Sequence, residues 1–169
     1  RGRSREAARR REECRVIEEP QILHTTAQPI AVVRLTVPRS EIRSVMMPAL
    51  TEVRRTLAEQ EVTPAGPWFT HHLRIDPEVF DLEVGVPVWS TFTETGRVVA
   101  SMLPAAKLAR TVHVGPYEEL ASAWSEFEEW IAAEGHECGA SMWECYVAGP
   151  ESGADASVWR TELNRVLVQ

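Results

Sequence analysis

The hydrophobic positions of this chain first predict two amphipathic helices. From residue 41 to about residue 60, apolar side chains recur every three to four positions, which is the period of one helical face. Ser40 is a suitable N-cap for this helix, and Pro48 inside it predicts a kink or a broken first turn. The same period returns at about residues 118–134, where Gly135 follows as a helix stop.

Around each helix the pattern changes to alternation, which is typical of strands. One alternating segment precedes each helix and two follow it, and the second set repeats the first about 75 residues later. The six segments are residues 30–37, 68–75, 80–88, 108–114, 140–147 and 161–168. The sequence therefore predicts an α+β fold of two strand–helix–strand–strand modules, related by a pseudo-twofold axis and joined in an antiparallel sheet. A ligand groove is expected between the modules, on the sheet surface that the helices leave uncovered, and residues 90–107 should add a strand or a ligand-facing loop.

Charge is unevenly distributed along the chain. Residues 1–15 hold seven Arg against three Glu, whereas the rest of the chain holds 11 basic and 22 acidic side chains. An acidic body argues against direct nucleic-acid binding by the domain and favours cationic or neutral ligands. We interpret residues 1–19 as a charged N-terminal tail or linker. Residues 20–169 then form one domain, with half-repeats at about 20–90 and 97–169.

Composition also bears on the compartment and on cofactors. The three cysteines are odd in number, and neither a signal peptide nor a membrane-length apolar run is present. These features predict a cytoplasmic protein without membrane contact. The sequence has no glycine-rich phosphate loop or paired-cysteine metal motif, so no cofactor and no metal are expected. A homodimer, or a DNA-binding domain outside this chain, stays open.

The strand expected near residue 144 carries the strongest candidate for a functional site. Alternation places Met142, Glu144 and Tyr146 on one face of it. A carboxylate in the middle of a hydrophobic strand needs a partner, because burying an unpaired charge is costly. The partner is either an arginine, such as Arg74 or Arg160, or a ligand or substrate. We favour the ligand.

Aromatic side chains provide candidate walls for a groove. Trp68 begins one strand and Trp89 follows another, and either ring could hold a planar ligand by stacking or a cation over its face. Tyr117 is either a second phenol of the site or a residue that only begins the second helix. The other large indoles are interpreted as core between helix and sheet, namely Trp124, Trp130 and Trp143.

Alignment of the two half-repeats adds three polar candidates. It places His72 opposite Tyr146 and Glu83 opposite Glu162, so these three residues are secondary candidates for ligand binding. His71 points to the other strand face, so the two adjacent histidines do not form a chelating pair.

Five short segments carry a further signal. They are FDLEVGVPV at 80–88, GPYE at 115–118, WECY at 143–146, GP at 149–150 and WRTEL at 159–163. Their order and spacing resemble the GyrI-like small-molecule-binding domain family, over roughly residues 20–168. The resemblance implies two strand–helix–strand–strand modules and a glutamate at the floor of the groove, and Glu144 is the matching position. Asn164 and Arg165 depart from the family, which usually shows an aromatic and an apolar residue there.

The resemblance implies three classes of function. Some members are effector-binding domains of bacterial regulators that sense lipophilic cations in multidrug recognition. The first hypothesis is therefore binding of a lipophilic, planar or cationic small molecule around Glu144. The alternative is a hydrolase that opens the cyclopropane of DNA-alkylating natural products, as a form of drug resistance. Glu144 would then activate water, and Tyr146 or Tyr117 would hydrogen-bond the reacting carbonyl. The third is a protein inhibitor of a gyrase-like partner.

Overall fold

The computed structural model describes residues 16–168, so most of the predicted charged tail, residues 1–15, lies outside the described residues. The described chain forms strands and helices in the order that the pattern predicts, with two strands added. Their bounds are β1 Gln21–His24, β2 Gln28–Pro38, α2 Ile42–Glu59, β3 Phe69–Arg74, β4 Val79–Pro87, β5 Val98–Leu103, β6 Lys107–Val114, α3 Leu120–Ala133, β7 Cys138–Ala148 and β8 Arg160–Leu167. Short 3-10 turns η1 (Arg39–Glu41) and η2 (Tyr117–Glu119) lead into the two helices.

One antiparallel sheet contains all eight of these strands, in the order β1-β6-β8-β7-β3-β4-β2-β5. Each module places its first strand outermost, its last strand in the middle and its second strand at the junction, which is the arrangement that a pseudo-twofold axis produces. The modules join where β3 pairs with β7, with Thr70 opposite Glu144. The predicted α+β fold with an antiparallel sheet is therefore confirmed.

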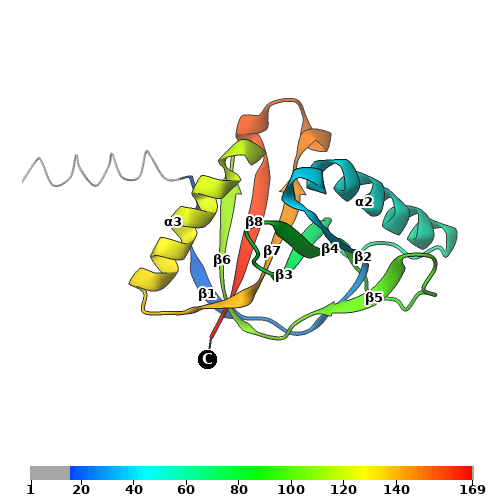
Figure 1. The fold of residues 1–169 in the computed structure, drawn as a ribbon, viewed down its shortest axis with the longest axis horizontal. Helices are drawn as coiled ribbons and strands as arrows, with labels where there is room; N and C mark the ends of the chain where they lie inside the picture. The colour runs from blue at the N-terminus through cyan, green and yellow to red at the C-terminus, as the bar shows by residue number, and fades with distance from the viewer. Residues whose placement is uncertain (1–15, 169) are drawn as a thin grey trace, which may run out of the picture.

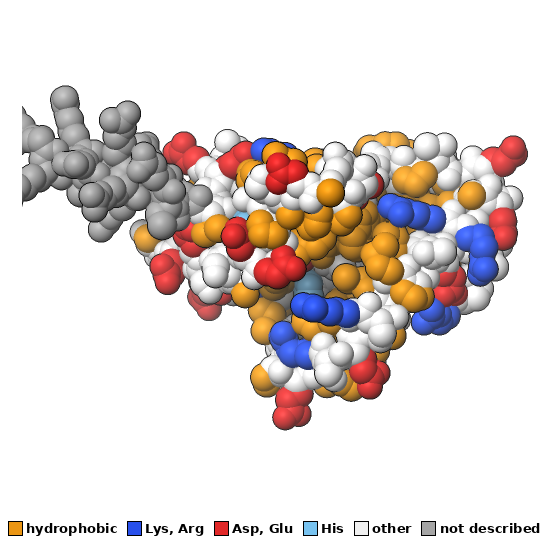
Figure 2. All heavy atoms as spheres, turned by 90° about the horizontal axis from the view of Figure 1, so that it is seen from above, with side chains coloured by type: hydrophobic (Ala, Val, Ile, Leu, Met, Phe, Trp, Pro, Cys, Tyr) orange, Lys and Arg blue, Asp and Glu red, His pale blue; other side chains and the backbone are white. Residues whose placement is uncertain are grey.

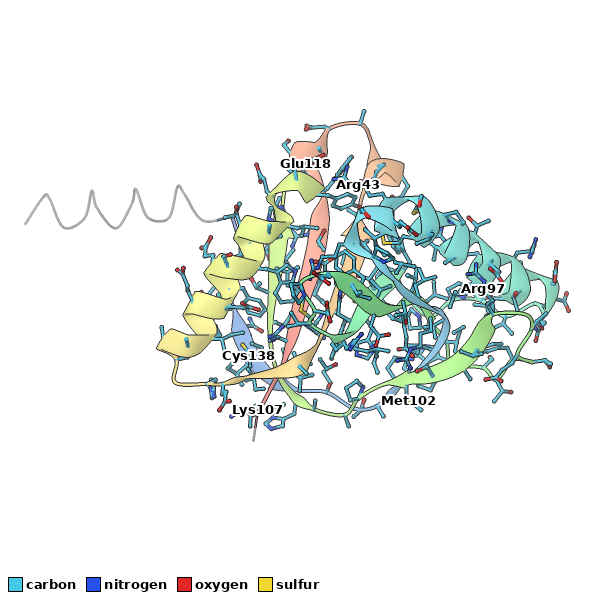
Figure 3. All side chains as sticks on the ribbon, viewed as in Figure 1. Arg43, Arg97, Met102, Lys107, Glu118 and Cys138 are labelled. Atoms are coloured by element: carbon cyan, nitrogen blue, oxygen red, sulfur yellow. The ribbon has the colours of Figure 1, made fainter. Side chains whose placement is uncertain are left out.

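Each of the two added strands, β1 and β5, pairs with a strand of the other module. β1 precedes the first module but pairs with β6 of the second, and β5 precedes the second module but pairs with β2 of the first. The segment at residues 90–107 thus contains a strand. Arg97, labelled in Figure 3, lies just before β5 and pairs with Glu52 on α2 at 2.7 Å, which ties this edge of the sheet to the helix.

Both helices pack their apolar stripes on one face of the sheet, which we call the helix face. Figure 1 shows α2 and α3 on either side of the central strands. The α2 core consists of Ala49, Leu50, Val53 and Leu57 against Ala31, Val33, Leu35, Leu82, Val84 and Val86. The α3 core consists of Ala123, Phe127 and Ile131 against Ala109, Leu163 and Leu167, with Ile17. Since each helix covers its own module, the junction strands β3 and β7 lie between the two helices.

A third cluster lies on the opposite side of the sheet, which we call the back face. It contains Ile30, Val32, Phe69, Leu103, Leu108 and Trp143. Trp143 is therefore a core residue as interpreted, but not between helix and sheet. Strand alternation sends its side chain away from Glu144 and so away from the helices.

The helix ends agree only in part with expectation. Gly135 has a φ of +78° and follows the end of α3, as predicted. Ser40 lies inside η1 and does not cap α2, and Pro48 sits within the continuous helix rather than breaking its first turn. Packing of the next residues, Ala49 and Leu50, against the sheet offsets the hydrogen bond that Pro48 removes. Within residues 16–168, no helix is long and apolar enough to cross a membrane.

Candidate ligand-binding groove

A cavity of about 410 Å³ opens on the helix face between α2 and α3. Its floor is formed by the junction strands and its walls by the two helices. Figure 2 shows apolar side chains gathered in a hollow, with charged side chains around it. The lining residues are Arg39, Ile42, Met46, Thr70, His72, Arg74, Ile75, Phe80, Leu82, Leu120, Ala121, Trp124, Glu128, Met142, Glu144 and Tyr146. The groove thus lies in the strip of sheet that the helices leave uncovered.

Strand register explains which polar side chains reach this floor. Thr70 pairs with Glu144 across the β3–β7 junction, and His72 pairs with Met142. Residues directly opposite each other in an antiparallel pair point to the same face, so all four face the gap between the helices. Tyr146 is two residues beyond Glu144 on β7 and joins them. The structure therefore brings together four predicted site residues: Met142, Glu144, Tyr146 and His72.

Glu144 is held at the centre of the floor by two neutral donors. The indole N–H of Trp124 donates to Oε1 at 2.6 Å, and the Tyr146 hydroxyl donates to Oε2 at 2.7 Å. The arginines considered as partners are engaged elsewhere, Arg74 with Asp81 and Arg160 with Glu18. Within the described part of the chain, no basic side chain forms an ion pair with Glu144.

Hydrogen bonds and ring contacts hold Tyr146 in place. The Tyr146 hydroxyl donates its hydrogen bond to Glu144, so its oxygen accepts a hydrogen bond from the Thr70 hydroxyl at 3.0 Å. Its ring stacks on Trp68 with centroids 4.0 Å apart, and Tyr117 meets the ring edge-on at 5.7 Å. Burial, together with the charge of Glu144, raises the pKa of Tyr146 well above its ordinary value. The phenol therefore remains a proton donor to Glu144.

Trp68 and Tyr117 act on the groove through Tyr146, since neither lines the cavity itself. Tyr117 lies in η2 and also contacts Trp159, with ring centroids 5.0 Å apart. Burial, and then the charges of Glu151 and Glu144, raise the pKa of Tyr117. Any Cβ at Gly149 would overlap the Tyr117 hydroxyl, so the glycine leaves the space that this ring occupies.

The rim of the groove carries basic side chains. Arg39 lies over the ring of Phe80, 4.3 Å from its centroid, and Phe80 packs edge-on against His72. Burial lowers the pKa of His72, although the charge of Glu144 partly opposes this shift. His72 is therefore neutral near neutral pH. Arg74 pairs with Asp81 at 3.5 Å, but Arg34 contacts the same carboxylate at 3.3 Å, so one positive charge of this group is not neutralised by Asp81.

Arg165 and Asn164, the residues that depart from the family pattern, lie on opposite faces of β8. Arg165 is buried on the helix face, where its Nη1 lies 2.9 Å from the Met142 sulfur and 3.5 Å from Glu128 Oε1. Asn164 accepts a hydrogen bond from Arg110 on the back face. Arg165 thus contacts Met142 from the neighbouring strand on the same face of the sheet.

Three other predicted site residues lie away from this groove. Glu83 and Glu162 point to the back face, where Glu83 pairs with His71 at 3.0 Å and Glu162 pairs with Arg110 at 3.3 Å. Trp89 follows β4, is 75% exposed and belongs to a separate surface depression with Phe92 and Met102. The half-repeat alignment identified corresponding strands correctly. However, Glu83 and Glu162 alternate with residues that face the helices, so both glutamates point to the back face.

Trp124 is a site residue that sequence reasoning missed. Its place in the helical stripe predicts a core residue, yet its indole lines the groove and donates to Glu144. The buried stripe of α3 is formed by Ala123, Phe127 and Ile131, and Trp124 lies at the margin of that stripe. A tryptophan at such a margin needs a partner for its N–H, and this requirement is the signal that could have found it.

The structure defines a class of α+β domain in which two helices on an antiparallel sheet flank a groove of small-molecule size. The chain belongs to the GyrI-like small molecule binding domain family, whose model matches residues 18–163. A comparison with curated protein sequences finds no match.

Solved structures of low identity share this fold. EcmrR in a DNA complex gives a TM-score of 0.78 at 18% identity, and covers 99% of this chain and 64% of its own. The EcmrR C-terminal domain gives 0.77 at 19% identity, covering 89% of this chain and 98% of its own. SAV2435 bound to tetraphenylphosphonium gives 0.65 at 12% identity, covering 89% and 94%. A hydrolase encoded by lin2189 from Listeria innocua gives 0.60 at 12% identity, covering 95% and 97%. This chain thus spans 64% of the length of EcmrR in its complex.

Proposed function

We propose that the groove binds a lipophilic, planar or cationic small molecule, with Glu144 as its polar centre. The observation that carries this proposal is the environment of the Glu144 carboxylate. Two neutral donors orient it at the floor of an apolar groove, and no described basic side chain pairs with it. A partly buried carboxylate gains most from a partner of opposite charge, and a ligand cation supplies one.

The walls favour a cation whose charge is spread over a large apolar body. Ile42 and Met46 of α2 and Leu120 of α3 provide apolar contact area on both sides. Trp124 adds a ring face that attracts cations. Arg39 at the rim repels any cation, but this interaction crosses solvent and is screened within about 10 Å at ordinary salt. A weakly hydrated, singly charged ligand is therefore preferred to a small multivalent one.

Similar folds support this ligand class. SAV2435 shares the fold and has been solved with tetraphenylphosphonium, which is a lipophilic cation. At 12% identity this likeness concerns the fold alone, so the case for this chain rests on the environment of Glu144.

Titration with tetraphenylphosphonium tests the proposal. Trp124 lies in the groove, so binding should quench tryptophan fluorescence, and calorimetry should give the affinity. Replacing a charge-assisted contact by a neutral one costs about 1.5–3 kcal/mol, so Glu144→Gln should weaken cation binding roughly 10- to 100-fold. Neutral triphenylphosphine oxide is the matched control, and its affinity should change little. Equal affinity of wild type and Glu144→Gln for the cation would contradict a role for the carboxylate charge.

A second candidate function is hydrolysis of a strained cyclopropane. The observation in its favour is the pairing of Glu144 with a phenol at 2.7 Å, and one structure of the same fold is a hydrolase from Listeria innocua. Glu144 would take a proton from water as the water oxygen attacks a ring carbon. The breaking C–C bond would deliver its electrons to a conjugated carbonyl, and Tyr146 would turn its hydroxyl from Glu144 to donate a hydrogen bond to that oxygen, while Tyr117 would act only through its contact with Tyr146.

Incubation with a cyclopropane-bearing alkylating agent separates the two candidates. Turnover would remove the cyclopropane chromophore catalytically in wild type and not in Glu144→Gln. Fluorescence quenching with an intact chromophore would support binding without catalysis.

Regulation is the setting we propose for ligand binding. EcmrR carries this fold as its C-terminal domain and forms a complex with DNA, and this chain covers 64% of that protein. A fused DNA-binding domain or a homodimer would therefore respond to ligand binding in the groove. Inhibition of a gyrase-like partner stays an alternative prediction, and it does not require the groove.

A further inference from the structure

A second polar cluster lies on the back face of the sheet, away from the groove. Three side chains from three strands form a hydrogen-bonded chain there. The hydroxyl of Ser141 lies 2.8 Å from Nε2 of His71, and Nδ1 of His71 lies 3.0 Å from Oε2 of Glu83. These are the distances and the order of a nucleophile, a general base and a carboxylate that orients the base.

The sheet itself aligns two of these residues. His71 on β3 is directly opposite Glu83 on β4, and both are buried, at 5% and 8% exposure. The rings of Trp143 and His71 pack in a T-shaped arrangement, with centroids 5.8 Å apart and planes at 88°, which fixes the plane of the imidazole. The base and its carboxylate therefore occupy one rigid position on the back face.

An irregularity in β7 places the serine. Cys138 pairs with Leu167 and Met142 pairs with Arg165, so residues 139–141 lie opposite a single residue of β8. Figure 3 labels Cys138 at the start of this strand. Bulges commonly occur next to active sites, where they redirect a side chain. Here the bulge ends at Ser141, which is half-buried and contacts His71.

Hydrogen bonding also determines the tautomer of His71. Burial alone would raise the pKa of Glu83, but hydrogen bonds from His71 and Ser101 outweigh it and lower that pKa. The Ser101 hydroxyl lies 2.7 Å from the other carboxylate oxygen. An ionised Glu83 accepts from Nδ1–H of His71. The lone pair of Nε2 then faces Ser141, which is the arrangement in which His71 can accept the serine proton.

We propose that Ser141, His71 and Glu83 form an esterase-like site in which Ser141 is the nucleophile toward small activated carboxylic esters. This site is separate from the groove, because Ser141 lies on the back face whereas Glu144 lies on the helix face. It is also independent of the proposed ligand binding, so either can fail without the other.

The reaction balances with ester and water as its only reactants. The Ser141 oxygen attacks the ester carbonyl carbon while its proton passes to Nε2 of His71. The bond to the alcohol oxygen breaks, and the alcohol leaves with that proton. Water then attacks the acyl-serine and gives a proton to His71, which returns it to the Ser141 oxygen as the carboxylic acid departs.

Labelling with a fluorophosphonate probe tests the site without a known substrate. The serine oxygen would bond to phosphorus as fluoride leaves, and peptide mass spectrometry would locate the adduct. The expected result is one adduct per chain, at Ser141, together with hydrolysis of p-nitrophenyl acetate above the buffer rate. No adduct on the folded wild-type protein would overturn the proposal, and so would an adduct at another serine.

Three variants give a matched comparison. Ser141→Ala should abolish the adduct, and Glu83→Gln should slow labelling by a factor on the order of 100 or more, because the histidine loses its orienting carboxylate. Ser157→Ala is the control, since Ser157 is exposed and its hydroxyl bonds to Asp155, far along the chain from Ser141, and its labelling should equal that of wild type. Circular dichroism would confirm that each variant is folded. Unchanged labelling in folded Glu83→Gln would show that Ser141 is not activated by this chain of residues.

Discussion

Three residues determine the chemistry of the groove floor at the scale of single side chains. Glu144 accepts from Trp124 on one oxygen and from Tyr146 on the other. Each donor is neutral, so the carboxylate is held in place while its charge stays available to a ligand. Removing either donor would leave part of a half-buried carboxylate unsatisfied, which costs more than the net value of the lost hydrogen bond.

The first prediction concerns Trp124. Trp124→Phe keeps an aromatic ring but removes the N–H, so the free energy of unfolding should fall by about 1–3 kcal/mol. Urea denaturation measures this change. Trp130→Phe is the control on the same helix, because Trp130 is also half-buried and makes no side-chain hydrogen bond among the described residues. A smaller loss for Trp124→Phe than for Trp130→Phe would show that the Glu144 contact contributes no stability.

A second prediction concerns pH and Tyr146. The pKa of this phenol is raised in the folded protein, so folding favours its protonated form. Its contribution to stability is complete below the unfolded-state pKa of about 10 and is lost as pH rises above that value. The free energy of unfolding should therefore drop as pH rises above about 10, and Tyr146→Phe should show a smaller drop. Equal drops in the two proteins would contradict the burial argument.

At the scale of elements, the close approach of strands β2 and β4 constrains the first module. A Cβ at Gly85 would overlap the carbonyl oxygen of Ala31 on the neighbouring strand. Backbone atoms of a paired strand cannot rotate away as a flexible side chain can. Gly85 is thus required by the pairing of β2 with β4, which in turn carries Val84 and Val86 into the α2 core.

The third prediction follows from this contact. Gly85→Ala should lower the free energy of unfolding by about 3 kcal/mol or more, because the two strands must separate locally. Gly135→Ala tests the other kind of glycine, since its φ is +78° but no atom of residues 16–168 lies within 4 Å of the place that a Cβ would occupy. Its loss should be about 1 kcal/mol. Thermal or urea unfolding measures both, and the reverse order would contradict the steric argument.

At the scale of the whole molecule, the modules depend on each other. β1 belongs to the first module in sequence but completes the sheet edge of the second, and β5 does the reverse. The junction β3–β7 also carries both halves of the groove floor. Neither half-repeat therefore contains its own complete sheet, although each contains its own helix core.

The fourth prediction is that the half-repeats do not fold alone. A fragment of residues 97–169 keeps β8 between β6 and β7 but lacks β1, the outer partner of β6, and β3, the junction partner of β7. We expect it to unfold without cooperativity, as followed by circular dichroism during heating. Mixing it with a fragment of residues 16–93 should restore a cooperative transition and the groove. A cooperative transition in either fragment alone would show that the modules are independent domains.

Local patterns in the sequence predicted most of the helices and strands of this protein. Helices α2 and α3, the six strands around them and the repeated order were readable because hydrophobic periodicity depends only on neighbouring residues. The same alternation grouped Met142, Glu144 and Tyr146 on one face. The family resemblance pointed to Glu144 as the floor residue, and Glu144 lines the cavity between the helices, while its role in ligand binding stays a prediction.

Only the tertiary structure decided which distant residues meet. Strand order and register placed His72 with Met142 in the groove and turned Glu83 and Glu162 to the back face. Packing of α3 brought Trp124 to Glu144, and the β7 bulge brought Ser141 to His71. The physical reason is that a sequence pattern specifies the face of a strand relative to its own neighbours. The partner across the sheet depends on pairing between segments far apart in the chain, and no local period records that pairing.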